Sequence, residues 1–105
     1  MQWLHYVALF FGGAFLINAV PHVVSGVMGR PFQSPFAKPP GQGLSSSTVN
    51  VLWGFFNAVV GYLLIRRAGS FDGHDAADMV AAALGALLLA LFLAHQFGRF
   101  NGGKL

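Results

Sequence analysis

The sequence predicts an all-α membrane protein with three transmembrane helices, at about residues 3–28, 48–65 and 78–98. Two observations lead to this fold class. The chain of 105 residues is 55% hydrophobic and only 9% charged, whereas ordinary soluble proteins have roughly 25% charged residues. The apolar residues also gather in three runs, each close to the roughly 20 residues that cross a bilayer as a helix. We therefore expect a single integral-membrane helical domain over residues 1–105.

The first apolar run carries a proline inside an otherwise helical pattern. The ring of Pro21 removes the hydrogen bond that the carbonyl of Ile17 would accept, which predicts a helix kinked at Pro21. A carbonyl freed in this way is tolerated in a membrane only where protein or a water-filled cavity satisfies it. No Lys or Arg precedes this run, so we expect it to be retained and not cleaved as a signal peptide.

The segment 29–46, "GRPFQSPFAKPPGQGLSS", predicts an ordered loop. Its four prolines limit the freedom of the backbone. Phe32 and Phe36 are apolar anchors that would pack on the helices or enter the membrane interface. Two interpretations stay open: a cap folded back over one end of the bundle, or an interfacial connector.

The second and third helices begin at residues that commonly cap helices. Ser45, Ser46 and Ser47 offer hydroxyl groups for the second helix, and Asp75 with Asp78 offers carboxylates for the third. Aromatic residues lie near the ends of the spans, where amphipathic rings favour the membrane interface.

Each helix carries one polar or small stripe. On the second helix Asn50, Gly54, Asn57 and Gly61 are spaced 4, 3 and 4 residues apart and share one face. The matching stripes are Phe11, Ala14, Asn18, His22 and Ser25 on the first helix, and Ala81, Gly85, Phe92 and Gln96 on the third, with His95 at its flank. Small residues let membrane helices approach closely, and amides then bond across the interface. We predict that Gly54, Gly61 and Gly85 serve helix packing.

Antiparallel threading brings several polar residues to one membrane face. This candidate polar site consists of Asn18, His22, Ser25, Asn50, Asn57, His95 and Gln96. His5, Arg66, Arg67 and His74 belong to the other face.

Three functional interpretations follow. The first is a packing or accessory membrane protein that forms homo-oligomers or joins a larger membrane complex, with its amide and glycine stripes as the binding surface. The second is a minimal channel or transporter for a small solute, lined by Asn18, His22, Asn50 and Asn57. The third is a haem-binding electron carrier that uses His22 and His95.

Other functions are disfavoured. The chain has no cysteine, and no carboxylate shares a membrane face with Ser25 and His22 to orient the ring for nucleophilic catalysis. We expect no enzyme, and under the first interpretation no cofactor and no metal. The cations are spread between the apolar runs, so they form no footprint for nucleic acid.

The distribution of positive charge predicts the topology. Arg30, Lys38, Arg99 and Lys104 lie on one side of the predicted bundle, and Arg66 with Arg67 lies on the other. Because cytoplasmic loops carry an excess of Lys and Arg, we expect a multi-pass protein of the cell membrane with its C-terminus in the cytoplasm.

Overall fold

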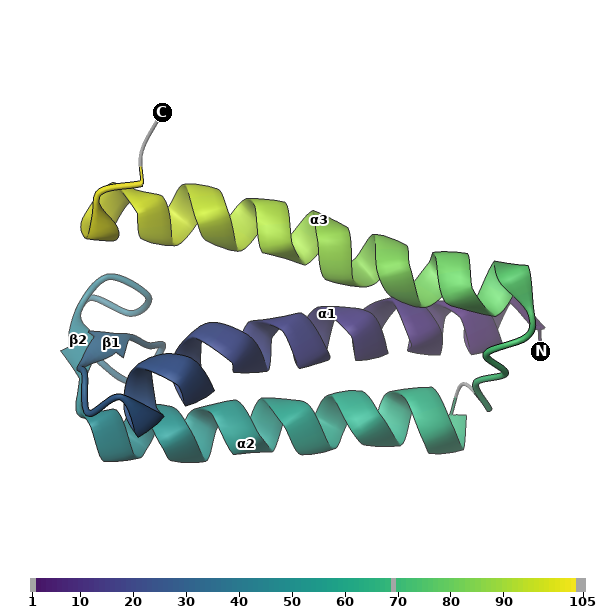
Figure 1. The fold of residues 1–105 in the computed structure, drawn as a ribbon, viewed down its shortest axis with the longest axis horizontal. Helices are drawn as coiled ribbons and strands as arrows, with labels where there is room; N and C mark the ends of the chain where they lie inside the picture. Colours follow the sequence, from purple (N-terminus) through teal and green to yellow (C-terminus); the bar gives the residue numbers. More distant parts are fainter. Residues whose placement is uncertain (1, 69, 104–105) are drawn as a thin grey trace.

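Three long helices make up most of the computed structural model, which describes residues 2–68 and 70–103 (Figure 1). Helix α1 covers Gln2–Val27, α2 covers Ser47–Leu63 and α3 covers Ala76–Asn101. One π-helical turn, η1 (Leu64–Ala68), extends α2. All three are long and apolar enough to cross a membrane, which confirms the predicted helices to within three residues at each end.

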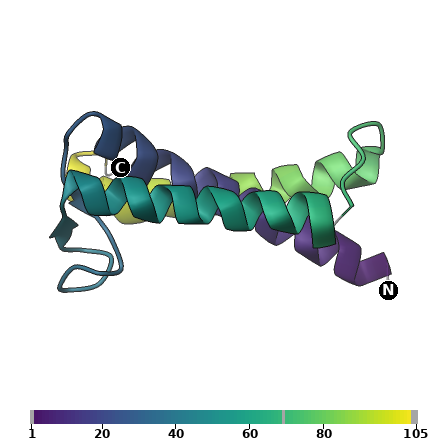
Figure 2. The same cartoon turned by 90° about the horizontal axis from the view of Figure 1, so that it is seen from below.

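Helix α1 lies between the other two helices (Figure 1). Helix α2 runs antiparallel to α1 and α3 runs parallel to it, and the view in Figure 2 shows α1 crossing behind α2 at an angle. The molecule measures 39 × 29 × 22 Å, and a hydrocarbon core is about 30 Å thick. The N-terminal end of α1 and the C-terminal end of α3 lie at opposite ends of the long axis, as expected for three helices threaded up and down.

Helix α1 continues through Pro21 as one element up to Val27. The helix therefore carries His22 and Ser25 in helical register with Asn18, as the stripe on this helix requires. The kink at Pro21 stays a prediction.

The loop between α1 and α2 contains a small antiparallel sheet that the sequence analysis did not predict. Strand β1 (Phe32–Gln33) pairs with β2 (Leu44–Ser45). Between them the chain turns back on itself, with the amide of Gly41 bonded to the carbonyl of Ser34 at 2.8 Å. Strands of two residues are too short to show the alternation by which strands are recognised in a sequence.

The interior of the bundle is polar and small, while the large apolar side chains lie outside. Among the described residues, the buried hydrophobic side chains are Leu9 and Ala19, and the buried polar ones include His22, Asn50, Asn57 and Asp78. Exposed apolar side chains line the outer faces of all three helices. Extended apolar surface of this kind marks a face for lipid or for another protein.

Glycines set the close approach of the helices. A Cβ atom at Gly85 of α3 would overlap the backbone carbonyl of Phe10 in α1. A Cβ at Gly54 would lie 2.5 Å from a methyl carbon of Val23, and a Cβ at Gly61 would lie 2.9 Å from the carbonyl oxygen of Gly12. The glycine stripes of α2 and α3 thus contact α1 of the same chain.

Candidate functional site

Asn50 lies at the centre of a polar network where α1, α2 and the loop meet. Its side chain is fully buried. Its Oδ1 atom is 2.7 Å from Nδ1 of His22, and its Nδ2 group lies within 3.2 Å of the backbone carbonyl oxygens of Phe32, Ser45 and Ser46. The side-chain amide of Asn50 therefore joins α1, the N-terminus of α2 and both strands of the loop, β1 and β2. Ser46 also caps α2, because its hydroxyl accepts the amide of Val49.

These contacts determine the tautomer of His22. The Nδ2 group of Asn50 faces three carbonyl oxygens, so the atom that faces His22 must be the amide oxygen, which only accepts hydrogen bonds. Nδ1 of His22 consequently carries a hydrogen and donates it. In a neutral ring the lone pair then sits on Nε2, and the bond to Asn50 fixes the orientation of the imidazole.

Aromatic rings surround His22. Its centroid lies 5.6 Å from that of Phe32, 6.0 Å from that of Phe97 and 6.3 Å from that of Trp53, all in edge-on arrangements. Only 2% of His22 is exposed. Through these contacts the imidazole of His22 links α1 to the loop and to both neighbouring helices, which accounts for a histidine within an apolar segment.

A second polar contact lies about 10 Å deeper along α2, two turns beyond Asn50. The amide of Asn18 donates to Oδ1 of Asn57 at 2.9 Å, and Asn57 donates to the carbonyl of Trp53 at 2.8 Å. The pair belongs to the lining of a largely apolar groove of about 320 Å³, whose other lining residues come from α1 and α3. Asn57 is 1% exposed, so it contributes little to the surface of this groove.

The loop is also fastened to the end of α3. Gln96 donates to the carbonyl of Gly41 at 3.2 Å, and Asn101 donates to Oε1 of Gln33 at 3.0 Å. Of the two interpretations of this segment, the contacts match a cap folded back over the bundle.

The remaining predicted site residues lie outside this network. His95 is exposed, whereas His22 is enclosed, so the structure does not bring them together as a pair of ligands. Ser25 is half-buried, and its backbone carbonyl accepts the amide of Arg30 at 2.9 Å. Within residues 2–68 and 70–103, no three His, Cys, Asp or Glu side chains are arranged to hold a metal ion.

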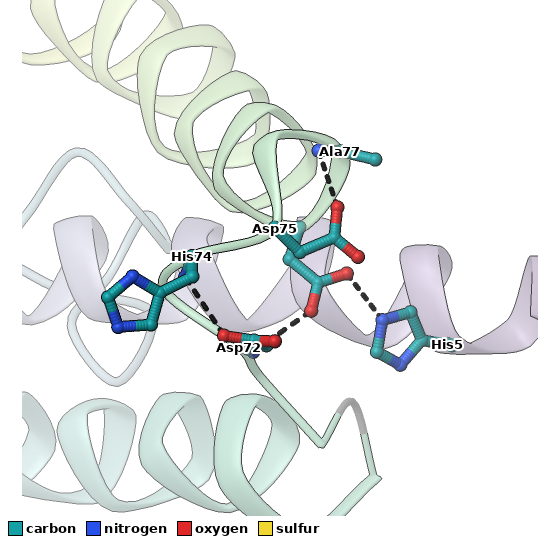
Figure 3. A network of polar contacts seen from close by, with 6 residues as sticks. His5, Asp72, His74, Asp75 and Ala77 are labelled. Carbon is teal, nitrogen blue, oxygen red and sulfur yellow. Dashed lines mark hydrogen bonds and ion pairs between the residues drawn. The ribbon is translucent and has the colours of Figure 1, made fainter.

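The opposite end of the bundle holds a polar cluster that the sequence analysis missed (Figure 3). Nε2 of His5 in α1 lies 2.6 Å from Oδ1 of Asp78 in α3, and the amide of Asp72 donates to Oδ2 of Asp78 at 2.9 Å. Asp75 caps α3 by accepting the amide of Ala77, as expected. Asp78 instead points inward and is 2% exposed. The contact between His5 and Asp78 could have been predicted, because up-and-down threading of three helices places the starts of α1 and α3 at the same end of the bundle.

Comparison of the chain with protein-family models, with curated protein sequences and with solved structures finds no match. The chemistry of the site therefore rests on its geometry. The described interior side chains of His22, Asn50, Asn57 and Asp78 bond to other side chains and to the backbone, whereas the buried Nε1 of Trp53 has no hydrogen-bond partner. The network is thus a means of holding three helices and a loop together.

Proposed function

We propose that this chain is a small integral membrane protein with a packing or accessory role, which binds copies of itself or a larger membrane complex through α3. One observation carries the proposal. Helix α3 packs mainly on α1, and its opposite face presents Val80, Leu84, Leu87 and Leu91, which are 46–60% exposed. Their spacing of 4, 3 and 4 residues is the spacing at which one helix packs along another. Exposed residues of α2 have the same spacing, but the α3 span is the less buried of the two within the chain, 11% against 22%.

The glycine and amide stripes are used for packing within the chain, so the outer face of α3 is the surface that we assign to association. The glycines and amides of α2 contact α1 within the chain, so they are already occupied. Association of membrane helices depends on van der Waals packing and not on a hydrophobic driving force. A regular row of branched side chains along one face of a helix provides such packing.

The proposed location is the cell membrane, with the loop and the C-terminal end of α3 in the cytoplasm. Arg30, Lys38 and Arg99 lie at this end, and Arg66 with Arg67 lies at the other. The excess of positive charge on one side supports this orientation.

The test is the mass of the particle extracted from the native membrane with a surrounding disc of lipid. We expect a defined protein mass well above the 11.2 kDa of one chain. Replacing Leu84, Leu87 and Leu91 together with alanine should reduce that mass to one chain. The matched control replaces Leu52, Val59 and Leu63, on the outer face of α2, with alanine. A single-chain particle for the wild-type protein would contradict the proposal.

A further inference from the structure

An apolar groove of about 500 Å³ lies between the loop and the first turns of α2. Phe36 from the loop and Val49, Leu52, Trp53 and Phe56 from α2 line it. The ring of Phe36 meets Trp53 edge-on at 5.1 Å between centroids, and Trp53 stacks on Phe56 at 5.7 Å. The volume is within the range of about 300–1,000 Å³ in which proteins bind small molecules.

The groove has the direction of a lipid chain. It extends from Val49 to Phe56 along α2, which is about 10 Å at 1.5 Å per residue. Val49 is in the first turn of α2, where the span begins. The groove thus starts at the membrane interface and continues into the region of the hydrocarbon. Phe36, which lies against Trp53 in the wall of the groove, is 63% exposed.

The end of the bundle at which the groove opens carries positive charge. Lys38 is exposed and follows Phe36 by two residues in the same loop, and Arg30 and Arg99 lie at this end of the bundle. The three carboxylate side chains, Asp72, Asp75 and Asp78, belong to the opposite end. An anionic head group at the end where the groove opens would meet positive charge and no side-chain carboxylate.

We propose that this groove binds one acyl chain of an anionic phospholipid, whose phosphate head group is held by Lys38. The proposal rests on the membrane location proposed above. It assigns the surface of α2 at the loop end to a lipid, while α3 is assigned to protein.

Fluorescence quenching by brominated lipids tests this directly. In the Trp3→Phe variant the one remaining tryptophan is Trp53, in the wall of the groove. This variant is placed in vesicles of phosphatidylcholine and phosphatidylglycerol in equal amounts, with bromine on the chains of one lipid or of the other. We expect brominated phosphatidylglycerol to quench Trp53 more strongly. Lys38→Gln should lower this preference about fivefold, the effect of one basic residue near the surface.

Two further variants complete the experiment. Arg66→Gln removes one positive charge at the opposite end and should leave the preference unchanged. Phe36→Ala removes the outer wall of the groove and should also lower the preference. Equal quenching by both lipids, or a preference that survives Lys38→Gln, would overturn the proposal. Absence of quenching by either lipid would overturn the membrane location itself, so the two failures are distinguishable.

Discussion

Asn50 and His22 form a buried contact between α2 and α1, with 2.7 Å between Oδ1 of the amide and Nδ1 of the imidazole. The same amide reaches the loop through three carbonyl oxygens. The two residues thus connect the packing of the helices to the conformation of the cap.

Asn50→Leu should release the loop and destabilise the protein by about 3 kcal/mol, because buried carbonyls lose their donor. The measurement is thermal unfolding in mild detergent, together with chymotrypsin cleavage after Phe32 or Phe36. The control is Asn101→Leu, which removes an exposed amide with a single side-chain contact to the loop and should cost less than about 1 kcal/mol. Equal stability of the Asn50→Leu variant and the wild type would contradict the assigned role of Asn50.

His22 and Asn50 should be coupled in a double-mutant cycle. His22→Phe and Asn50→Leu each remove the shared hydrogen bond, so the double variant should lose less stability than the sum of the two. We expect a coupling free energy of about 1 kcal/mol, as found for hydrogen bonds between membrane helices. Strictly additive effects would mean that the two side chains do not interact.

Gly85→Val should separate α3 from α1. A Cβ at this position meets the backbone of Phe10, which cannot move without displacing the whole helix, so we expect a loss of about 3 kcal/mol or more. Ala94→Val, on the exposed face of the same helix, adds comparable bulk where there is space. Similar melting temperatures for the two variants would show that α3 does not approach α1 at Gly85.

The contact between His5 and Asp78 should tolerate an amide but not a hydrocarbon. In Asp78→Asn the amide oxygen accepts from the amide of Asp72, and the NH₂ group donates to a neutral His5 ring. Asp78→Leu loses both contacts and leaves the ring nitrogen of His5 and the backbone amide of Asp72 unpaired. We expect the melting temperature of the Asn variant to remain near that of the wild type and that of the Leu variant to be clearly lower. The reverse order would contradict the geometry of this cluster.

The helices could be predicted from sequence because their signal is local. Runs of apolar residues with few charges define three spans whatever their partners are, and the 4, 3 and 4 spacing of Asn50, Gly54, Asn57 and Gly61 defines one face. The structure places all four at buried positions of α2. The caps at Ser46 and Asp75 are equally local, since each accepts a hydrogen bond from an amide two or three residues further on.

Pairings between distant segments were less accessible. The sequence placed His22 and Asn50 near one membrane face but did not indicate that they bond, and it placed His95 with them although its side chain is exposed. The sequence indicates how deep a residue lies along its helix, but it does not determine how each helix is rotated about its own axis. Two residues at the same depth can therefore point toward each other or apart. Asp78 was interpreted as a cap because its position at the start of a helix gives the same local pattern as a carboxylate that points inward. The β1–β2 pairing depends on contacts across the whole loop.

Site-specific photo-crosslinking in the native membrane tests the central claim most directly. A benzophenone side chain is placed at Leu87 on the outer face of α3, and at Val59 on the outer face of α2, which is equally exposed at 54%. We expect a protein adduct of one defined mass from position 87 and none from position 59. Lipid adducts alone from position 87, or the same protein adduct from both positions, would contradict the assignment of α3 as the surface through which this protein associates.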